Sequence, residues 1–548
     1  MVLILFVIAP GLPRQALQIR YDESSAGDQN SMLLFEIVRT SQQVGQTSGR
    51  LDKLGHLGAC LRHLAPEEIE IGVNFLAGRL RQGTIGIGAA TLRSVAAVAA
   101  TKEPVLTLAQ VDAACETISR TTGAGSTAER RRILESLFSH ATPDEQHFLL
   151  RLFVGELRQG ALEGIMAEAI ARAANVPAAS VRRACMLTGD LSVVAKSALS
   201  EGVSGLARFS LQLLQPIQPM LAQPAEDVAD ALQNLHEAAF EYKMDGARVQ
   251  VHKQGADIRV FTRTLKDVTN SVPEVLDIVH RLPARSSIIL DGEVLALRPD
   301  GSPHPFQVTM RRFGRKLGVV SMRDSMPLTP FFFDCLHLDG EDLIDRSSAD
   351  RITALHDALP SSFVTPRLVT QELSTAEAFL HEALSQGHEG VMAKALDATY
   401  EAGRRGSAWL KIKRAHTLDL IVLAVEWGSG RREGWLSNLH LGARDPVNGG
   451  FVMLGKTFKG MTDEMLIWQT EKFKALQLST DGYTVSVRPE VVVEIAFNDI
   501  QASPHYPGGL ALRFARVKRY RPDKTAAQAD TIETVRALYT RQAEATHS

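Results

Sequence analysis

The stretch Phe240-Glu241-Tyr242-Lys243-Met244-Asp245-Gly246-Ala247-Arg248 places a lysine beside an acid, a flexible glycine and an arginine within a strand-like run. An amine that attacks phosphorus must first lose its proton, so it needs cationic or apolar surroundings that favour its neutral form. Arg248 follows Lys243 by five residues, a spacing that suits a contact with a phosphate or a ribose. The pattern is typical of a covalent lysine nucleophile, although an exposed lysine in a hairpin gives the same short pattern.

Further short motifs follow Lys243 in a fixed order along the chain. They are Asp291-Gly292-Glu293 after an apolar run, Phe333-Asp334, Glu389-Gly390-Val391-Met392-Ala393-Lys394, and Trp409-Leu410-Lys411-Ile412-Lys413. Each motif is weak evidence by itself, and the ordered set is strong evidence because the motifs supply one another's context.

This ordered series resembles the covalent nucleotidyltransferase superfamily, and most closely the ATP-dependent DNA ligases of bacteria. The resemblance runs from about Met32 to the last family element, Arg521-Pro522-Asp523-Lys524. It implies that ATP adenylates Lys243, that AMP then passes to the 5′-phosphate of a nick, and that the adjacent 3′-hydroxyl displaces AMP. It also implies ATP and Mg²⁺ as cofactors and nicked double-stranded DNA as the partner of a monomer that can clamp around it. DNA repair, replication and recombination are the processes implied, without a choice among them.

The resemblance further implies a role for the charged residues of the later motifs. Lys411 and Lys413 are two apart on a strand and therefore point to one face. There they would stabilise charge on the α-phosphate and, by repulsion, help deprotonate Lys243. Glu293 and Glu389 would bind Mg²⁺, which takes oxygen ligands from one or two acids together with substrate phosphates.

The remaining family positions would complete the ATP site. Phe333 would stack on the adenine, and the residues contacting the adenine pocket, ribose or phosphates would be Glu241, Arg248, Arg263, Glu293 and Arg405. Arg263 lies in Thr262-Arg263-Thr264, where many relatives have Ser-Arg-Asn, and we expect its role to survive that change. Arg521, Asp523 and Lys524 would meet the β- and γ-phosphates when the C-terminal domain closes, and that domain would then swing away about a hinge near Arg414 to Leu418.

A chain of 548 residues is too long for one core and predicts several domains. We expect a poorly ordered extension over 1–31, an all-helical DNA-binding domain over 32–210, an α+β nucleotidyltransferase (adenylation) domain over 211–416, a β-barrel OB-fold over 417–524, and a helix with a frayed tail over 525–548. The OB-fold prediction rests on strand-like runs over 418–427, 436–441, 451–458 and 483–496, with one helix near 462–476.

The helical region contains a six-residue sequence pattern that occurs twice. Gly78-Arg79-Leu80-Arg81-Gln82-Gly83 and Gly155-Glu156-Leu157-Arg158-Gln159-Gly160 both follow apolar helical stretches. Glycines on each side of an arginine let backbone amides and a guanidinium approach a phosphate closely. Either copy alone is better explained by a helix C-cap, but the repetition, together with the resemblance to a ligase DNA-binding domain, favours DNA-phosphate contacts by Arg81 and Arg158.

Composition limits the compartment and the cofactors. The net charge of −2 means that any basic surface for DNA must be local. The four cysteines are far apart, which argues against a zinc module and a disulfide framework and fits a reducing cytoplasm, near the nucleoid for a bacterial ligase. The apolar run Val2 to Ile8 is too short to span a bilayer, so we expect no membrane association.

Two other functions stay open on the sequence. The first is an RNA ligase or a GTP-dependent capping enzyme, because nothing in Lys243 itself selects adenine or DNA. The long helical region before Lys243 argues against both. The second is a non-catalytic duplex-binding protein derived from a ligase, which the presence of Lys243, Glu293, Glu389, Lys411 and Lys413 argues against.

Overall fold

The computed structural model describes residues 31–47, 49–157, 163–282, 286–314, 323, 326–402, 405–413 and 416–544. Contacts divide the chain into two compact units, one ending at Ala174 and one beginning at Asn175. Residues 1–30 of the expected extension lie outside the described residues, as do Arg158 and residues 414–415 of the expected hinge.

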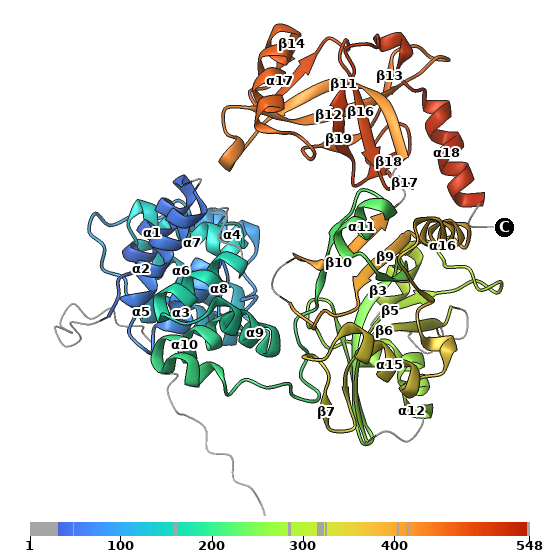
Figure 1. Ribbon diagram of the computed structural model, residues 1–548. Helices are drawn as coiled ribbons and strands as arrows, with labels where there is room; N and C mark the ends of the chain where they lie inside the picture. The colour runs from blue at the N-terminus through green and yellow to red at the C-terminus, as the bar shows by residue number, and fades with distance from the viewer. Residues whose placement is uncertain are drawn as a thin grey trace, which may run out of the picture. The chain divides into compact units, whose positions relative to one another are not determined.

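The described part of the first unit is helical, as the sequence predicts (Figure 1). Its helices are α1 (Leu34–Gln46), α2 (Arg50–Arg62), α3 (Ile69–Leu76), α4 (Ala89–Val95), α5 (Leu108–Arg120), α6 (Ser126–Ser139), α7 (Pro143–Val154) and α8 (Glu163–Ala174). Capping boxes begin α5 at Thr107 and α7 at Thr142, where side chains satisfy backbone amides that have no partner within the helix. The apolar faces meet in a core that includes Leu34, Phe75 and Phe138.

The second unit begins with two helices, α9 (Ala178–Thr188) and α10 (Leu191–Leu206). The sequence assigns these residues to the helical domain that ends at 210, whereas contacts group them with the chain that follows. Met186 and Leu187 of α9 belong to a buried cluster that also contains Ile289, Tyr400 and Trp409.

Two five-stranded sheets form the centre of the second unit. The first sheet has the order β1, β10, β9, β2, β8 and the second has the order β4, β3, β5, β6, β7. Their strands are β1 (Leu221–Pro224), β2 (Ala238–Lys243), β3 (Ala247–Gln254), β4 (Asp257–Thr262), β5 (Ser287–Ala296), β6 (Leu328–Leu338), β7 (Glu341–Asp342), β8 (Arg367–Thr370), β9 (Gly390–Ala395) and β10 (Arg405–Lys413). The associated helices are α11 (Val228–Leu235), α12 (Pro273–Arg281), α13 (Phe306–Phe313), α15 (Ser348–Ala358) and α16 (Leu373–Ser385).

The chain crosses from the first sheet to the second between β2 and β3. Phe240 and Tyr242 on β2 pack into the core of the first sheet, and Val249 and Val251 on β3 pack into the core of the second. Because side chains alternate along a strand, burial of Phe240 and Tyr242 on one face turns Glu241 and Lys243 to the other. That face lines the cavity described below.

The C-terminal region is strand-rich. Its main sheet has the order β13, β12, β11, β15, β14, and β16 joins β11 to β19. The strands are β11 (His416–Trp427), β12 (Leu436–Arg444), β13 (Phe451–Thr457), β14 (Gln477–Thr480), β15 (Thr484–Val487), β16 (Val492–Phe497), β17 (Asp499–Ala502), β18 (Leu510–Arg513) and β19 (Arg516–Tyr520), with helices α17 (Asp463–Ala475) and α18 (Ile532–Glu544).

One strand prediction in this region is wrong. The run expected over 483–496 is two strands, β15 and β16, which both pair with β11. Pro489 lies in the turn between them, and proline has no amide hydrogen to donate to a continuous ladder.

Candidate active site

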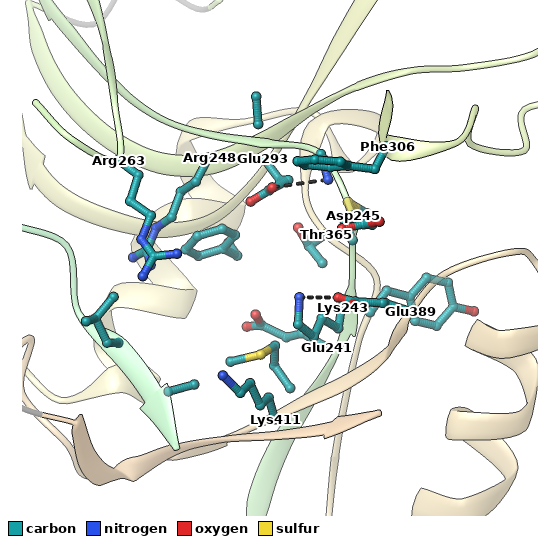
Figure 2. Close-up of a pocket in the computed structure, with 18 of the residues that line it drawn as sticks. Glu241, Lys243, Asp245, Arg248, Arg263, Glu293, Phe306, Thr365, Glu389 and Lys411 are labelled. Atoms are coloured by element: carbon teal, nitrogen blue, oxygen red, sulfur yellow. Dashed lines mark hydrogen bonds and ion pairs between the residues drawn. The ribbon is translucent and has the colours of Figure 1, made fainter. Parts of the chain in front are cut away.

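Lys243 lies at the point where the chain leaves the first sheet. It is the last residue of β2 and pairs across the sheet with Gly390 of β9. Gly246, in the turn to β3, passes so close to β5 that a Cβ atom there would lie 2.4 Å from the carbonyl oxygen of Val294. The glycine therefore allows the crossing that places Lys243 in the wall of a cavity of about 570 Å³ (Figure 2).

Glu389 links the lysine at the end of β2 to one at the end of β10. Its carboxylate lies 2.6 Å from Lys243 Nζ and also accepts a hydrogen bond from Lys413. Gly390 has φ +146°, and a Cβ atom there would lie 2.1 Å from the carbonyl oxygen of Ile412, so glycine is required beside β10. Burial tends to raise the pKa of Glu389, but the charges of Lys243 and Lys413 outweigh it and lower that pKa overall.

A second carboxylate, Glu293, faces the same cavity from β5. It is half-buried and accepts a hydrogen bond of 3.2 Å from the backbone amide of Gly246. Burial raises its pKa to about 7, against the opposing effects of Lys243 and Arg248. Burial, followed by repulsion from Glu389, also raises the pKa of Asp245. Acidic groups that repel one another around a cavity would be stabilised by a cation.

Arg248 is held in the cavity wall by a fixed set of partners. Its Nη2 atom lies 2.6 Å from Asp291 Oδ2 and its Nη1 atom donates to the carbonyl oxygen of Met220 at 2.8 Å. Tyr400 also donates a hydrogen bond to Asp291 at 2.7 Å. The Asp291 charge raises the pKa of Arg248 against the effect of burial, so the guanidinium stays charged. It lies 5.3 Å from the centre of the Phe333 ring.

One end of the cavity combines aromatic rings with buried charges. Phe333 on β6 and Trp409 on β10 meet edge to face, with ring centres 6.0 Å apart. Lys394 Nζ lies 4.5 Å from the Phe333 ring centre and 2.7 Å from Glu241 Oε2. Burial lowers the pKa of Lys394, while Glu241 opposes that shift. An aromatic face next to a paired acid and base suits a flat heterocycle with polar edge groups.

Most residues expected from the sequence meet at this cavity. Its lining includes Glu241, Lys243, Arg248, Arg263, Glu293, Phe333, Glu389, Lys411 and Lys413. Figure 2 shows Arg263 beside Arg248, with Lys411 on the opposite side. Arg405 is the first residue of β10, and its side chain lies outside the described residues.

Other expected residues have partners elsewhere. Arg81 lies in the loop after α3 and forms an ion pair with Asp112. Arg521 and Lys524 both pair with Asp419 of β11, at 3.0 and 2.5 Å, and Arg521 also pairs with Asp523. The strong hydrogen bond from Arg521 lowers the pKa of Asp523 to about 2.

The cavity also contains residues to which the sequence assigns no role. Asp245 and Lys394 lie within the quoted motifs, so their position was a usable signal. Phe306, at the start of α13, and Thr365, in the loop before β8, line the cavity from segments without a motif, so local sequence gives no signal for them. Arg367 and Tyr400 are not among the described lining residues, but each contacts one: Arg367 pairs with Glu241, and Tyr400 accepts a hydrogen bond of 3.4 Å from Arg248.

Metal and membrane features are few among the described residues. They contain no cluster of three or more His, Cys, Asp or Glu side chains arranged to hold a metal ion. The four cysteines, all within the described ranges, are buried and form no disulfide. No helix in the described ranges is long and apolar enough to cross a membrane.

Comparisons with known proteins agree with this arrangement. Residues 219–413 match the ATP dependent DNA ligase domain, 432–524 the ATP dependent DNA ligase C terminal region, and 91–170 the DNA ligase N terminus. A probable DNA ligase of Anaeromyxobacter sp. (strain Fw109-5) is 61% identical over 516 residues, which are 94% of this chain and 99% of the relative. A probable DNA ligase of Sorangium cellulosum (strain So ce56) is 56% identical over 93% of this chain and 95% of its own length.

A solved structure shares the fold. Pmar-Lig_Pre. aligns with a TM-score of 0.59 at 19% identity, over 89% of this chain and 99% of its own. This likeness concerns the fold alone, whereas the sequence matches extend over nearly the full length of the relatives. The chain belongs to the ATP-dependent DNA ligase family.

Proposed function

We propose that this chain seals nicks in duplex DNA through a covalent Lys243–AMP intermediate. In the first step neutral Lys243 Nζ attacks the α-phosphorus of ATP, a phosphorus–nitrogen bond forms, and pyrophosphate leaves. In the second step a 5′-phosphate oxygen at the nick attacks the same phosphorus and Lys243 is released. In the third step the 3′-hydroxyl attacks the 5′-phosphate, so that a phosphodiester forms and AMP leaves.

The observation that carries this proposal is the position of Lys243 within the cavity. Its Nζ atom forms an ion pair of 2.6 Å with Glu389, and the same cavity wall contains Lys411 and Lys413. When phosphates enter, they can replace the lysines' carboxylate partner, and the β10 lysines then face the α-phosphate where negative charge develops. Arg248 lies 5.3 Å from the centre of the Phe333 ring, and Arg263 lies beside Arg248 (Figure 2), which suits the ribose and base end of the nucleotide.

The carboxylates of the cavity fit Mg²⁺. Glu293 lies on β5 and Glu389 immediately before β9, and both line the cavity. Burial raises the pKa of Glu293 to about 7, and a bound cation would favour its charged form. Two protein carboxylates, with phosphate and water oxygens, match the usual donor set of Mg²⁺. When bound, the ion would neutralise phosphate charge during transfer.

The helical unit and the C-terminal strand-rich region would bind the DNA and the triphosphate. We assign the strand-rich region to an OB-fold and Arg521, Asp523 and Lys524 to alignment of the leaving pyrophosphate. Arg81 in the helical unit would contact a DNA phosphate. These assignments rest on the family resemblance and on the charges of the residues.

The test is adduct formation with labelled nucleotide followed by denaturing electrophoresis. We expect an AMP adduct from ATP, little from GTP, and none in Lys243→Ala or in Lys243→Arg, because a guanidinium stays protonated. Peptide mass spectrometry should locate AMP on Lys243, and circular dichroism should show that both variants fold. AMP on another lysine, or a stable adduct with GTP but not ATP, contradicts the assignment. Nicked DNA and nicked RNA substrates then separate a DNA ligase from an RNA ligase.

A further inference from the structure

Glu241 is a buried carboxylate with both oxygens occupied by cations. Its Oε1 atom lies 2.6 Å from Arg367 Nη2 and accepts a second hydrogen bond from Arg367 Nε at 2.8 Å. Its Oε2 atom lies 2.7 Å from Lys394 Nζ. The three side chains are between 2% and 5% exposed, so water screens these interactions little.

Arg367 differs from its neighbours because it does not reach the cavity. Glu241, Lys394 and Phe333 line the cavity, and Arg367 is not among the lining residues that the structure describes. It comes from β8, where it pairs directly with Glu241 of β2. A third contact runs from Arg367 Nη2 to the carbonyl oxygen of Phe333 at 3.0 Å. One guanidinium therefore connects β2 in the first sheet to β6 in the second.

This arrangement fixes the two groups best suited to recognise a base. Phe333 offers a ring for stacking, and Glu241 offers an acceptor at the edge of the same space. Adenine presents an amino donor beside a ring-nitrogen acceptor, whereas guanine presents a carbonyl acceptor beside a ring N–H donor. A carboxylate next to an ammonium can tell these patterns apart only if each is held in place, because either order could otherwise be accommodated.

Lys394 alone cannot hold Glu241 in one orientation. The ammonium group of lysine contacts the carboxylate through one nitrogen atom at the end of a flexible side chain. The guanidinium of Arg367 instead contacts one carboxylate oxygen through two nitrogen atoms, and it has a further N–H donor for the carbonyl oxygen of Phe333. We propose that Arg367 is a positioning residue for nucleobase selection: it orients Glu241 and Phe333 without touching the nucleotide. This inference rests on the proposed function.

The experiment compares wild type with Arg367→Met and Arg367→Lys in the full-length chain. Lys243–AMP formation is followed in single-turnover reactions over a range of ATP and GTP concentrations. In Arg367→Met we expect the half-saturating ATP concentration to rise by about tenfold or more, because Glu241 loses its two-point anchor, with the maximal rate within about twofold of wild type. The preference for ATP over GTP should fall. Arg367→Lys restores one contact and should recover part of both parameters.

A matched control separates positioning from simple loss of stability. Arg312 forms a comparably buried ion pair of 2.6 Å with Glu274 in the same unit, and neither residue is among the described residues that line the cavity. Arg312→Met should lower the melting temperature as Arg367→Met does, but leave the half-saturating ATP concentration and the ATP preference unchanged.

The outcomes distinguish this inference from the proposed function. If the Arg367→Met variant folds and keeps the wild-type half-saturating ATP concentration and the wild-type preference for ATP over GTP, the proposed role of Arg367 is wrong. A lower amount of active protein with unchanged saturation also overturns it, because that result is purely structural. If Arg367→Met does not fold, unchanged parameters in folded Arg367→Lys have the same meaning. A wild-type chain that forms no Lys243 adduct with ATP overturns both proposals, whereas a normal wild-type adduct with an inert Arg367 overturns only this one.

Discussion

Glu389 cannot serve all its proposed partners at once. In the structure it pairs with Lys243 and Lys413, whereas the proposed chemistry needs a neutral Lys243 and a carboxylate free to bind Mg²⁺. Entry of ATP would resolve this conflict, because its phosphates would take the place of the carboxylate beside the lysines, and Glu389 would then be available with Glu293 to hold Mg²⁺. The ion pairs thus hold the side chains near their working positions before the substrate arrives.

This exchange predicts a defect that depends on the metal. Glu293→Ala and Glu389→Ala should each raise the Mg²⁺ concentration that gives half-maximal Lys243 adenylation, by roughly tenfold. Magnesium titrations at saturating ATP provide the measurement, with Glu377→Ala on the exposed surface of α16 as the control. Titration curves that match wild type in both variants would remove these residues from the metal site.

The chemical types at the site were predictable from sequence, but their partners were not. Lys243, Glu293, Glu389 and Lys413 lie in short motifs that can be read locally. Arg367 and its contact with Glu241 depend on the register between β2 and β8, whose sequences are more than a hundred positions apart. No local periodicity encodes such a register, so the sequence could not reveal a residue that acts through a neighbour.

At the scale of elements, two motifs contain a glycine at a point where paired strands approach closely. Gly246 and Gly390 are both positions where a Cβ atom would meet a backbone oxygen of an adjacent strand, at 2.4 and 2.1 Å. Each glycine lies one or a few residues from a charged group of the cavity, Lys243 or Glu389. Close backbone approach is a property of paired strands, so the sequence could mark these glycines but could not give the reason for them.

In the helical unit, the described residues of the two repeated segments, 78–83 and 155–157, lie next to each other. Gly78, in the first loop, has φ +74°, and a Cβ atom there would lie 3.6 Å from Leu157 of the second. Gly155 ends α7 with φ +77°. The positive φ values agree with the helix-cap explanation, and the contact of Arg81 with a DNA phosphate stays a prediction.

Arg81 offers a test between these two explanations. If it contacts a DNA phosphate, Arg81→Ala should weaken binding to nicked duplexes of every sequence and lower the slope of log affinity against log salt by about one. Fluorescence anisotropy at several salt concentrations measures this slope, and Lys243 adenylation should stay normal. Arg120→Ala, which removes another exposed, ion-paired arginine of the same unit, is the control. A slope equal to wild type would leave Arg81 as a structural partner of Asp112.

At the scale of the whole molecule, helical and strand-rich regions were predictable because their apolar periodicities differ over long segments. Boundaries were harder to predict. Helices α9 and α10 have the same composition as the helices before them, yet Met186 and Leu187 pack in the second unit. Which core a helix joins depends on long-range packing, and amphipathicity alone does not specify it.

The C-terminal basic element is held by an acid of its own region. Arg521 and Lys524 share Asp419, so their charges are satisfied without nucleotide. Binding of the β- and γ-phosphates would require these cations to exchange Asp419 for phosphate oxygens. Such an exchange would make the proposed closure of the C-terminal region dependent on ATP, because the triphosphate supplies the phosphate oxygens that replace Asp419.

Simultaneous substitution of Arg521, Asp523 and Lys524 by alanine should therefore impair the first step most. We expect Lys243 adenylation to fall severely, because the leaving pyrophosphate loses its alignment, while DNA that already carries a 5′-adenylate is still sealed in part by Lys411, Lys413 and the metal site. The two steps can be measured separately with labelled ATP and with pre-adenylated nicked DNA. Arg516→Ala with Lys518→Ala removes exposed positive charge from neighbouring β19 and should spare both steps, which separates a specific role from a general effect of charge. Normal adenylation by the triple variant would exclude this element from the first step.

Deleting the chain from about residue 416 should give the same contrast between the two steps, with weaker sealing because a DNA-contacting region is also lost.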